Sequence, residues 1–458
     1  MLRQWQIECT SLALKKYQSG SSHFFCQATP GAGKTVFAAT VASRLLEENM
    51  IDLVLCFSPS LIVSNSIKAT FSHYLNRTFN GGLGSIGQSL TYHSIQFLSD
   101  EFWQTLRNHR VLVVFDEIHH CSGSDFETAN VWGQQILCKI QGLAKYTLAM
   151  SGTPWRTDAL PIVLSEYTDP TGQLLIDYQY TLKQAIVNNV CRTPQIVLVD
   201  SEHLSVTTDK KVESFSSIME MMRETKVSYQ SVIHNPDAME YLLGLGCQKL
   251  EEIRKKSSTA GGLAVASSVQ HAIKIKKILS EKYHQSVVIV TYRHKEPLAE
   301  IERYRHTNTQ WIVSIGMISE GTDIPRLQVC CHMSAVKTEL YFRQVLGRIL
   351  RVNGAENQEA WLFTFAEKNL IEFSERVAVD IPESCVHVKM GAVEELAIKR
   401  QNKALKDVAS IESDCDWNVK SPWTSQKDDI VIMHQGFNEF DDIQLGTFKE
   451  RVISAFLD

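Results

Sequence analysis

Short apolar runs alternate with longer, helix-like stretches along the first third of the chain. Four of these runs are continuous, which is typical of strands buried on both faces of a parallel sheet. They are Phe24–Gln27, Leu53–Phe57, Val111–Phe115 and Tyr146–Met150. Because segments of helix length separate them, we predict consecutive strand–helix–strand units.

The same pattern returns in the second half of the chain and predicts a second domain of this kind. Its apolar runs are Gln195–Val199, Gly262–Ala266, Val287–Val290 and Trp311–Ile315. About residues 205–258 are charged and helix-like, and we interpret them as a helical insertion in the second domain. The expected class is α/β, with a first lobe at residues 1–170, a second lobe at 171–385 and a small C-terminal extension of unknown role at 386–458.

Charge is unevenly distributed along the chain. The 458 residues carry a net charge of −5, but residues 407–458 alone hold 11 Asp or Glu against 4 Lys or Arg. The rest is nearly neutral, so it can bind nucleic acid through a local basic stripe. The acidic end also contains Trp417, Trp423, Phe437 and Phe440. Two interpretations stay open: these aromatics form the core of a packed appendage, or the segment docks a protein or occludes a nucleic-acid groove.

The composition favours a cytoplasmic protein that is not attached to a membrane. The 11 cysteines form no CxxC pair and show no zinc-ligand spacing. Cys330 and Cys331 lie in an apolar run and are expected to fill a core. The first residues lack the apolar region of a secretory signal, and no apolar run is long enough to span a membrane.

A glycine-rich loop after the first strand is the strongest chemical signal. It reads Ala28-Thr29-Pro30-Gly31-Ala32-Gly33-Lys34-Thr35, which fits the phosphate-binding pattern GxxxxGK[ST] except that Ala28 occupies the first glycine position. Glycines let backbone N–H groups approach phosphates, and the N-terminus of the next helix favours negative charge. We predict that Lys34 reaches the β- and γ-phosphates of ATP and that Thr35 binds Mg²⁺. The other predicted nucleotide contacts of the loop are Thr29, Gly31, Ala32 and Gly33.

Two acids end the third apolar run, in the sequence Asp116-Glu117-Ile118-His119. Adjacent carboxylates at the end of a buried strand are costly unless a cation or a water molecule uses them. We predict that Asp116 holds Mg²⁺ and that Glu117 polarises the attacking water as a base.

In this order, the motifs resemble those of superfamily 2 helicases and translocases, in the branch that includes the helicase subunits of restriction enzymes (ResIII-like). The Asp116–His119 box resembles the second motif of the family. Leu2-Arg3-Gln4-Trp5-Gln6 looks like the adenine-recognition segment, which implies nucleotide contacts for Arg3 and Gln6. Ser151-Gly152-Thr153-Pro154 resembles the third motif. The resemblance implies that His119, Ser151 and Thr153 couple the nucleotide state to lobe movement.

Two further segments of the first lobe resemble family segments that contact the nucleic-acid backbone. They are Ser58-Pro59-Ser60 and Thr91-Tyr92-His93-Ser94. Hydroxyl and N–H groups suit phosphate contacts. The expected nucleic-acid contacts in these segments are Ser58, Pro59, Thr91 and Tyr92.

The second lobe carries the remaining motifs of the resemblance. Gly262–Leu279, with Ser267 and His271, looks like the fourth motif. In Ser319–Pro325, which resembles the fifth, Gly321 and Asp323 would face the nucleotide and Thr322 a phosphate of the strand. Gln344–Arg351 matches the QxxGRxxR sixth motif, so Gln344, Arg348 and Arg351 complete the expected catalytic set. Three residues apart on a helix, the two arginines would share one face and reach the γ-phosphate.

The resemblance implies two tandem RecA-like lobes, an ATP and Mg²⁺ site in the cleft between them, and movement along nucleic acid. DNA is favoured over RNA by the restriction-enzyme branch, in a restriction, repair or phage-related system, although DEIH boxes also occur in RNA helicases. An RNA helicase and a nucleotide-gated binding subunit without unwinding activity stay as alternatives. Because no nuclease motif is recognised, a nuclease or another defence-system subunit is the expected kind of protein partner.

Overall fold

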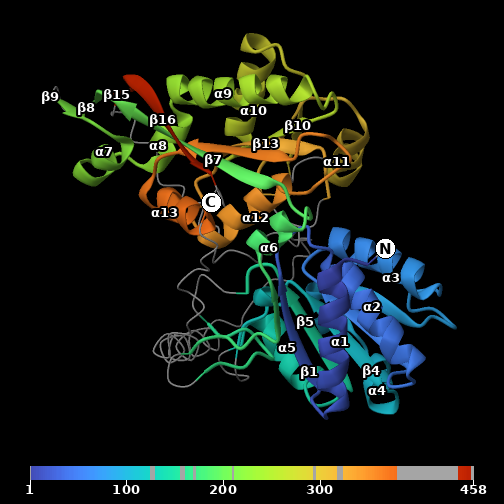
Figure 1. The fold of residues 1–458 in the computed structure, drawn as a ribbon. Helices are drawn as coiled ribbons and strands as arrows, with labels where there is room; N and C mark the ends of the chain where they lie inside the picture. The colour runs from blue at the N-terminus through green and yellow to red at the C-terminus, as the bar shows by residue number, and fades with distance from the viewer. Residues whose placement is uncertain are drawn as a thin grey trace, which may run out of the picture. The chain divides into compact units, whose positions relative to one another are not determined.

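The computed structural model describes residues 2–123, 129–154, 160–168, 172–208, 211–291, 296–316, 323–378 and 442–454. The chain forms two compact units, one that includes Gly33–Thr181 and one that includes Leu182–Pro382 (Figure 1). Each unit is an α/β structure around its own sheet, which is all-parallel in the first unit and mostly parallel in the second.

The first unit contains a six-stranded, all-parallel sheet in the order β3-β2-β4-β5-β1-β6. Its strands are β1 (His23–Ala28), β2 (Leu53–Ser58), β3 (Gly87–Thr91), β4 (Val111–Asp116), β5 (Tyr146–Ser151) and β6 (Tyr178–Tyr180). Its helices are α1 (Gln4–Gln18), α2 (Lys34–Glu47), α3 (Leu61–Leu75), η1 (Tyr92–Phe97), α4 (Asp100–Asn108), η2 (Ile118–His120) and α5 (Val131–Lys139).

All four strands predicted for the first lobe are confirmed as β1, β2, β4 and β5. Every residue of β4 and β5 is buried, as continuous apolar runs in the middle of a parallel sheet require. The strands that the apolar pattern did not predict, β3 and β6, are short and polar. They lie at the two edges of the sheet, where less apolar surface has to be covered.

The second unit contains a seven-stranded sheet in the order β11-β12-β10-β13-β14-β7-β16. Its strands are β7 (Thr193–Glu202), β10 (Gly261–Ala266), β11 (Val287–Val290), β12 (Trp311–Ser314), β13 (Leu327–Met333), β14 (Glu359–Phe365) and β16 (Thr447–Ser454). Helices α6 (Leu182–Val187), α10 (Val269–Lys277), η3 (Ile278–Lys282), α11 (Pro297–His306), α12 (Glu339–Ile349) and α13 (Lys368–Ala378) accompany them. The four predicted strands are confirmed as β7, β10, β11 and β12, and Cys330 and Cys331 are fully buried in β13.

The segment expected to be a purely helical insertion is not helical throughout, which corrects that expectation. It begins with an antiparallel hairpin, β8 (Leu204–Thr208) and β9 (Lys211–Phe215), before α7 (Ile218–Glu224), α8 (Tyr229–His234) and α9 (Pro236–Arg254). Val206 alternates with polar neighbours in β8, a period of two that the surrounding charged residues obscure. Helix α9 buries Leu242, Leu243 and Leu250 within the second unit, so it belongs to the core of that unit.

The end of the chain returns to the second unit. Strand β16 pairs antiparallel with β7 from Thr447 opposite Glu202 to Ser454 opposite Gln195, while β15 (Asp442–Gln444) pairs with β8. Phe448 stacks on Tyr241 of α9 with a distance of 4.3 Å between ring centroids. The aromatics Trp417, Trp423, Phe437 and Phe440 lie outside the described residues. Among the described helices, none has the length and apolar character that a membrane span requires.

Candidate nucleotide site

Three of the predicted motifs follow neighbouring strands of the first sheet. The glycine-rich loop follows β1, Glu117 follows β4, and Gly152 follows β5, which lies between β1 and β4. All carboxyl ends of a parallel sheet lie at one edge, which is where such sheets bind ligands. Residues far apart in sequence are thereby brought to one place.

The backbone of the loop has the conformation that its glycines were expected to allow. Gly31 and Gly33 have φ angles of 83° and 89°, in the left-handed region that other residues rarely adopt. Helix α2 begins directly after, at Lys34, and has no acidic residue in its first turn. The N-terminus of this 14-residue helix therefore favours an anion. Ala28, at the first glycine position, is the last residue of β1 and does not have a positive φ, so alanine fits there.

Lys34 and Glu117 form an ion pair. The Lys34 Nζ atom lies 3.0 Å from Glu117 Oε1 and donates to the Ala28 carbonyl at 3.3 Å. The side chain of Lys34 is 10% exposed and that of Glu117 is 25% exposed. The lysine expected to bind phosphate and the carboxylate expected to activate water are thus in direct contact.

Glu117 is held by three other groups that follow β4 and β5. Its Oε2 atom accepts from the Ser151 hydroxyl at 3.3 Å and from the Gly152 N–H at 3.2 Å, and lies 3.4 Å from His119 Nδ1. His119 Nδ1 is also 2.8 Å from Ser151 Oγ. Since the serine donates to Glu117, we assign the His119 proton to Nδ1. Thr153 joins this network because its N–H donates to Ser151 Oγ at 3.0 Å.

The environment of Glu117 favours its ionised form. Burial alone would raise the pKa of its carboxyl group, but Lys34, His119 and the Gly152 N–H lower it to about 2. Its backbone has φ 51° and ψ 52°, in the left-handed region that a residue with a side chain adopts only when its surroundings impose it.

Asp116 and Thr35 supply oxygen atoms suited to Mg²⁺. Asp116 is the last residue of β4 and is 7% exposed, and Thr35 lies in the first turn of α2. Mg²⁺ prefers such hard oxygen donors and is commonly held by one or two protein oxygens together with substrate phosphates. The Tyr92 hydroxyl donates to the Asp116 carbonyl at 2.8 Å, which fixes the end of the strand.

The expected adenine-recognition segment is tied to the phosphate loop. Gln6 Oε1 accepts from the Arg3 N–H at 2.8 Å, and Gln6 Nε2 donates to the Gly33 carbonyl at 3.0 Å. A side-chain amide has two donors and two acceptor lone pairs, so these two contacts use one donor and one lone pair of Gln6. A side chain at Gly33 would begin 2.9 Å from Gln6 Nε2, so this position requires glycine for space as well as for its φ angle.

Two residues expected to contact nucleic acid are buried instead, which corrects their assignment. Ser58 is fully buried, and its hydroxyl donates to the carbonyl groups of Ser60 and Leu90. The Tyr92 side chain is fully buried as well, with its hydroxyl on Asp116. Pro59 and Thr91 are half-buried, and Thr91 Oγ1 caps η1 by accepting from the Ser94 N–H.

In the second unit, the two arginines of the sixth motif do not share a helix. Helix α12 ends at Ile349, so Arg348 is helical and Arg351 lies beyond the end. The expectation that both lie three residues apart on one helical face is therefore wrong. Arg351 instead forms an ion pair with Asp323, which joins two residues that had been assigned separately to the nucleotide. Gly321 and Thr322 of the fifth motif lie outside the described residues.

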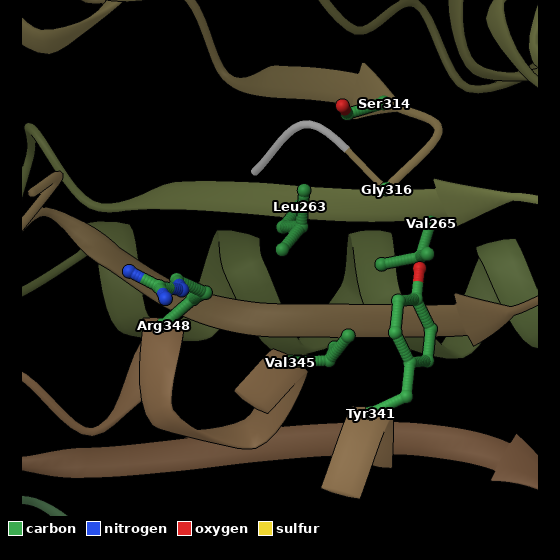
Figure 2. A pocket seen from close by; sticks show the side chains of 7 residues that line it. All are labelled: Leu263, Val265, Ser314, Gly316, Tyr341, Val345 and Arg348. Carbon is green, nitrogen blue, oxygen red and sulfur yellow. The ribbon is translucent and has the colours of Figure 1, made fainter. Parts of the chain in front are cut away.

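Arg348 lines a small pocket within the second unit (Figure 2). The other residues that line it are Leu263, Val265, Ser314, Gly316, Tyr341 and Val345. In Figure 2 the guanidinium of Arg348 points away from the apolar side chains of Leu263 and Val345. Gln344 precedes Val345 on α12 and is half-buried.

The buried His271 and the half-buried Ser267 of the fourth motif form a polar cluster with the half-buried His234 of α8. Ser267 Oγ lies 2.9 Å from His271 Nδ1 and 2.8 Å from His234 Nε2, and the two imidazole rings stack. Burial, followed by the charges of His234 and Lys274, lowers the pKa of His271 to about 3. His271 is therefore neutral at physiological pH, consistent with a packing and hydrogen-bonding role.

Sequence reasoning missed two residues of this architecture. Gly152 binds Glu117 through its backbone N–H, which no side-chain pattern reveals. Arg192 is fully buried and donates to the carbonyl groups of Pro325, Leu327 and Ile349, at 2.9, 2.6 and 3.2 Å. It thereby joins the segment after Asp323 to the end of α12. An arginine just before a strand carries no local signal of such a role.

Comparison with known proteins finds two families on this chain. Residues 1–156 match the family described as type III restriction enzyme, res subunit, and residues 247–353 match the helicase conserved C-terminal domain. An uncharacterised protein of Mycobacterium leprae is 26% identical over 388 residues, which make up 81% of this chain and 63% of that protein. The DNA 3'-5' translocase XPB2 of Sulfurisphaera tokodaii is 22% identical over 401 residues, which make up 81% of this chain and 83% of that protein.

A solved structure agrees in fold. The fragment assigned as an HsdR subunit of a type I restriction enzyme from Vibrio vulnificus YJ016 matches with a TM-score of 0.56 and 17% identity, covering 83% of this chain and 67% of that chain. The chain spans 63% of the length of the mycobacterial relative. The two family matches occur in order, and the observed phosphate loop and acidic box lie within the first of them. The chain therefore belongs to superfamily 2 of helicases, in the branch of the restriction-enzyme helicase subunits.

Proposed function

We propose that this protein hydrolyses ATP to move along DNA. The contact between Lys34 and Glu117, with Ser151, Gly152 and His119 around the same carboxylate, is the observation that carries the proposal. In this contact the lysine proposed to bind phosphate touches the carboxylate proposed to activate water. Hydrogen bonds connect the same carboxylate to Ser151 and Gly152 at the end of β5. A carboxylate that only stabilised the fold would not need to lie beside a phosphate loop.

The ion pair suggests how substrate binding prepares the base. The γ-phosphate oxygens of ATP compete with Glu117 for the Lys34 ammonium group. When the lysine turns to the phosphate, Glu117 loses the strongest influence that keeps its pKa low, while the burial that raises the pKa stays. The carboxylate then becomes a better proton acceptor for the attacking water.

Other residues have supporting roles in this proposal. Thr35 and Asp116 hold Mg²⁺, which when bound neutralises charge on the phosphates. The hydrogen bonds among Ser151, Thr153, His119 and Glu117 change when Glu117 changes its contacts, and they thereby couple the nucleotide state to lobe movement. Gln6 reads adenine with its remaining donor and acceptor. Arg348 and Arg351 act on the γ-phosphate, and Arg351 must first leave Asp323.

DNA is the proposed track because the translocase XPB2, which aligns with most of this chain, is named for movement on DNA. The match to the res subunit of restriction enzymes supports the same choice and a nuclease or defence-system subunit as partner. Movement depends on contacts to phosphate and sugar, so we expect little sequence specificity.

Steady-state ATPase assays test this function. Wild type, Lys34→Ala and Glu117→Gln are each measured without nucleic acid and with single-stranded DNA, duplex DNA or RNA. Lys15→Ala, an exposed lysine of the same unit, is the matched control and should behave as wild type. We expect DNA to stimulate turnover and both site variants to abolish it.

Other outcomes of the ATPase assay would support a different function. Stimulation by RNA alone would identify an RNA helicase. Turnover that no polymer changes would favour a nucleotide-gated subunit controlled by a protein partner. Undiminished hydrolysis by Lys34→Ala would overturn the assignment of the site itself.

A further inference from the structure

One stretch of the first unit contains no acidic residue. No Asp or Glu occurs between Asp52 and Asp100, although the chain has 51 of them in 458 residues. This stretch comprises β2, α3, β3 and η1, so it includes one edge of the sheet and the strand beside it. Its basic residues are few, since Lys68 and Arg77 are the only Lys or Arg in it. The stretch itself is therefore nearly neutral, and the exposed acids Asp100 and Glu101 follow it directly at the start of α4.

Large apolar side chains are exposed where these two strands end. Ser58 of β2 lies opposite Thr91 of β3, so the residues that follow both strands emerge at the same edge of the sheet. Leu61, at the start of α3, is 66% exposed, and Phe97, at the end of η1, is 72% exposed. The buried residues of η1 are Tyr92 and Ile95, which leaves Phe97 directed to solvent.

His93 supports Phe97 from the side. The two ring centroids are 5.3 Å apart and the ring planes meet at 66°, an edge-to-face contact that leaves ring surface of Phe97 open. Gln96 Nε2 lies 3.5 Å from His93 Nδ1, which helps to hold the imidazole in place. We call His93 and Phe97 the aromatic ledge.

The surroundings of the aromatic ledge favour one kind of occupant. The face of an aromatic ring stacks on any nucleobase, and such stacking is available only to bases that are not already stacked and paired in a duplex. The hydroxyl and amide side chains of this acid-free stretch can contact phosphate and sugar without charge. Single-stranded DNA fits both features.

We propose that Phe97, supported by His93, is a stacking platform for a base of single-stranded DNA. The proposal rests on the function proposed above and adds a residue and a mode of contact to it. Because the contact is aromatic and the surface holds few cations, the affinity gained at the ledge depends little on salt, unlike affinity gained from lysine and arginine.

The test measures the affinity of the whole protein for a short single-stranded oligodeoxynucleotide that carries one 2-aminopurine, whose fluorescence is quenched by stacking. Phe97→Ala is compared with wild type, Phe97→Trp and Leu83→Ala over a series of salt concentrations. Leu83 is a matched control because it is a fully exposed apolar residue in the turn before β3, at the opposite end of that strand. Thermal unfolding checks that each variant is folded.

We expect Phe97→Ala to bind about ten-fold more weakly, because stacking on one aromatic side chain typically contributes that much. Its quenching should be lost and its salt dependence should equal that of wild type. Phe97→Trp should restore both affinity and quenching, and Leu83→Ala should not differ from wild type. A Lys68→Ala variant should instead reduce the salt dependence.

Two results would overturn the ledge alone: wild-type affinity in Phe97→Ala while DNA still stimulates the ATPase, or an equal loss of affinity for duplex DNA, which offers no free base. A wild-type protein that binds no DNA would overturn the proposed function as well. Loss of affinity for RNA but not for DNA would contradict the occupant chosen here.

Discussion

At the scale of single residues, Arg192 shows how a buried cation can organise a fold. Its guanidinium donates to three backbone carbonyl groups, one of them at the C-terminus of α12, where the helix dipole favours positive charge. Burial lowers the pKa of Arg192 to about 10, so it stays protonated at neutral pH. The fifth and sixth motifs of the second unit are thus held together by one side chain.

Replacing Arg192 with methionine should therefore destabilise the second unit. The variant leaves buried carbonyl groups without a donor, and we expect the free energy of unfolding to fall by roughly 3 kcal/mol. Arg192→Lys should be intermediate, because an ammonium group cannot reach three carbonyls in the same geometry. Urea-induced unfolding measures the effect, with the exposed Arg223→Met as the control. If Arg192→Met unfolds at the same urea concentration as wild type, the carbonyl contacts are not important for stability.

The sequence predicted where the motif residues lie along the strands and helices better than it predicted what they contact. The phosphate-loop pattern and the acidic box placed Lys34 and Glu117 at strand ends, but not their ion pair, because spacing in sequence gives no distance across a sheet. The sequence also could not reveal that the side chains of Ser58 and Tyr92 are buried. At the end of a strand, one turn of backbone decides whether a side chain faces solvent or core. Arg351 was misplaced for a related reason, since the motif does not mark where its helix ends.

At the scale of elements, the predicted strands were those with continuous apolar runs. Such runs identify strands in the middle of a sheet, which are buried on both faces. Strand β16 could not be found in this way because most of its residues are exposed, and its charged side chains Lys449, Glu450 and Arg451 are typical of a protected edge. These residues are fixed by partners elsewhere: Lys449 pairs with Glu202, Arg451 with Glu375, and Glu450 accepts from the Tyr241 hydroxyl.

Removing β16 should expose a longer and more apolar edge. A chain that ends before Thr447 leaves β7 unpaired on one side, and β7 contains the buried run Ile196–Val199. We expect this truncation to lower the thermal unfolding temperature and to promote aggregation. A chain that ends at Ser454 keeps the strand and is the control. Light scattering during heating measures both effects, and equal behaviour of the two chains would show that β16 contributes nothing to protecting β7.

At the scale of the whole molecule, buried histidines make stability depend on pH. Burial lowers the pKa of His271 to about 3, with contributions from His234 and Lys274, and that of His332 to about 4. An unfolded histidine has a pKa of about 6.5, so between these values the unfolded chain binds protons that the folded chain does not. Stability is therefore complete above about pH 7 and is lost as the pH falls towards 4.

The predicted loss of stability at low pH can be measured. The free energy of unfolding should fall between about pH 7 and about pH 5, a window that lies above the titration of ordinary carboxylates. His332→Gln removes one of the histidines with a lowered pKa and should make the decline shallower while lowering stability at neutral pH. Urea unfolding across this range gives the slope. A flat profile in the wild type would mean that the buried imidazoles gain protons without unfolding.

The position of β16 also has a consequence for how the protein is made. The strands of the first sheet lie within residues 23–180, so this sheet can fold while the rest of the chain is still being synthesised. The second sheet receives β16 only when residues 447–454 emerge, long after β7 has been synthesised. Until then the edge of β7 is open, and a nascent chain in that state is vulnerable to association with its neighbours on the same messenger. Stalled translation after β14 and before β16 should therefore be more harmful to this protein than stalling between the two units.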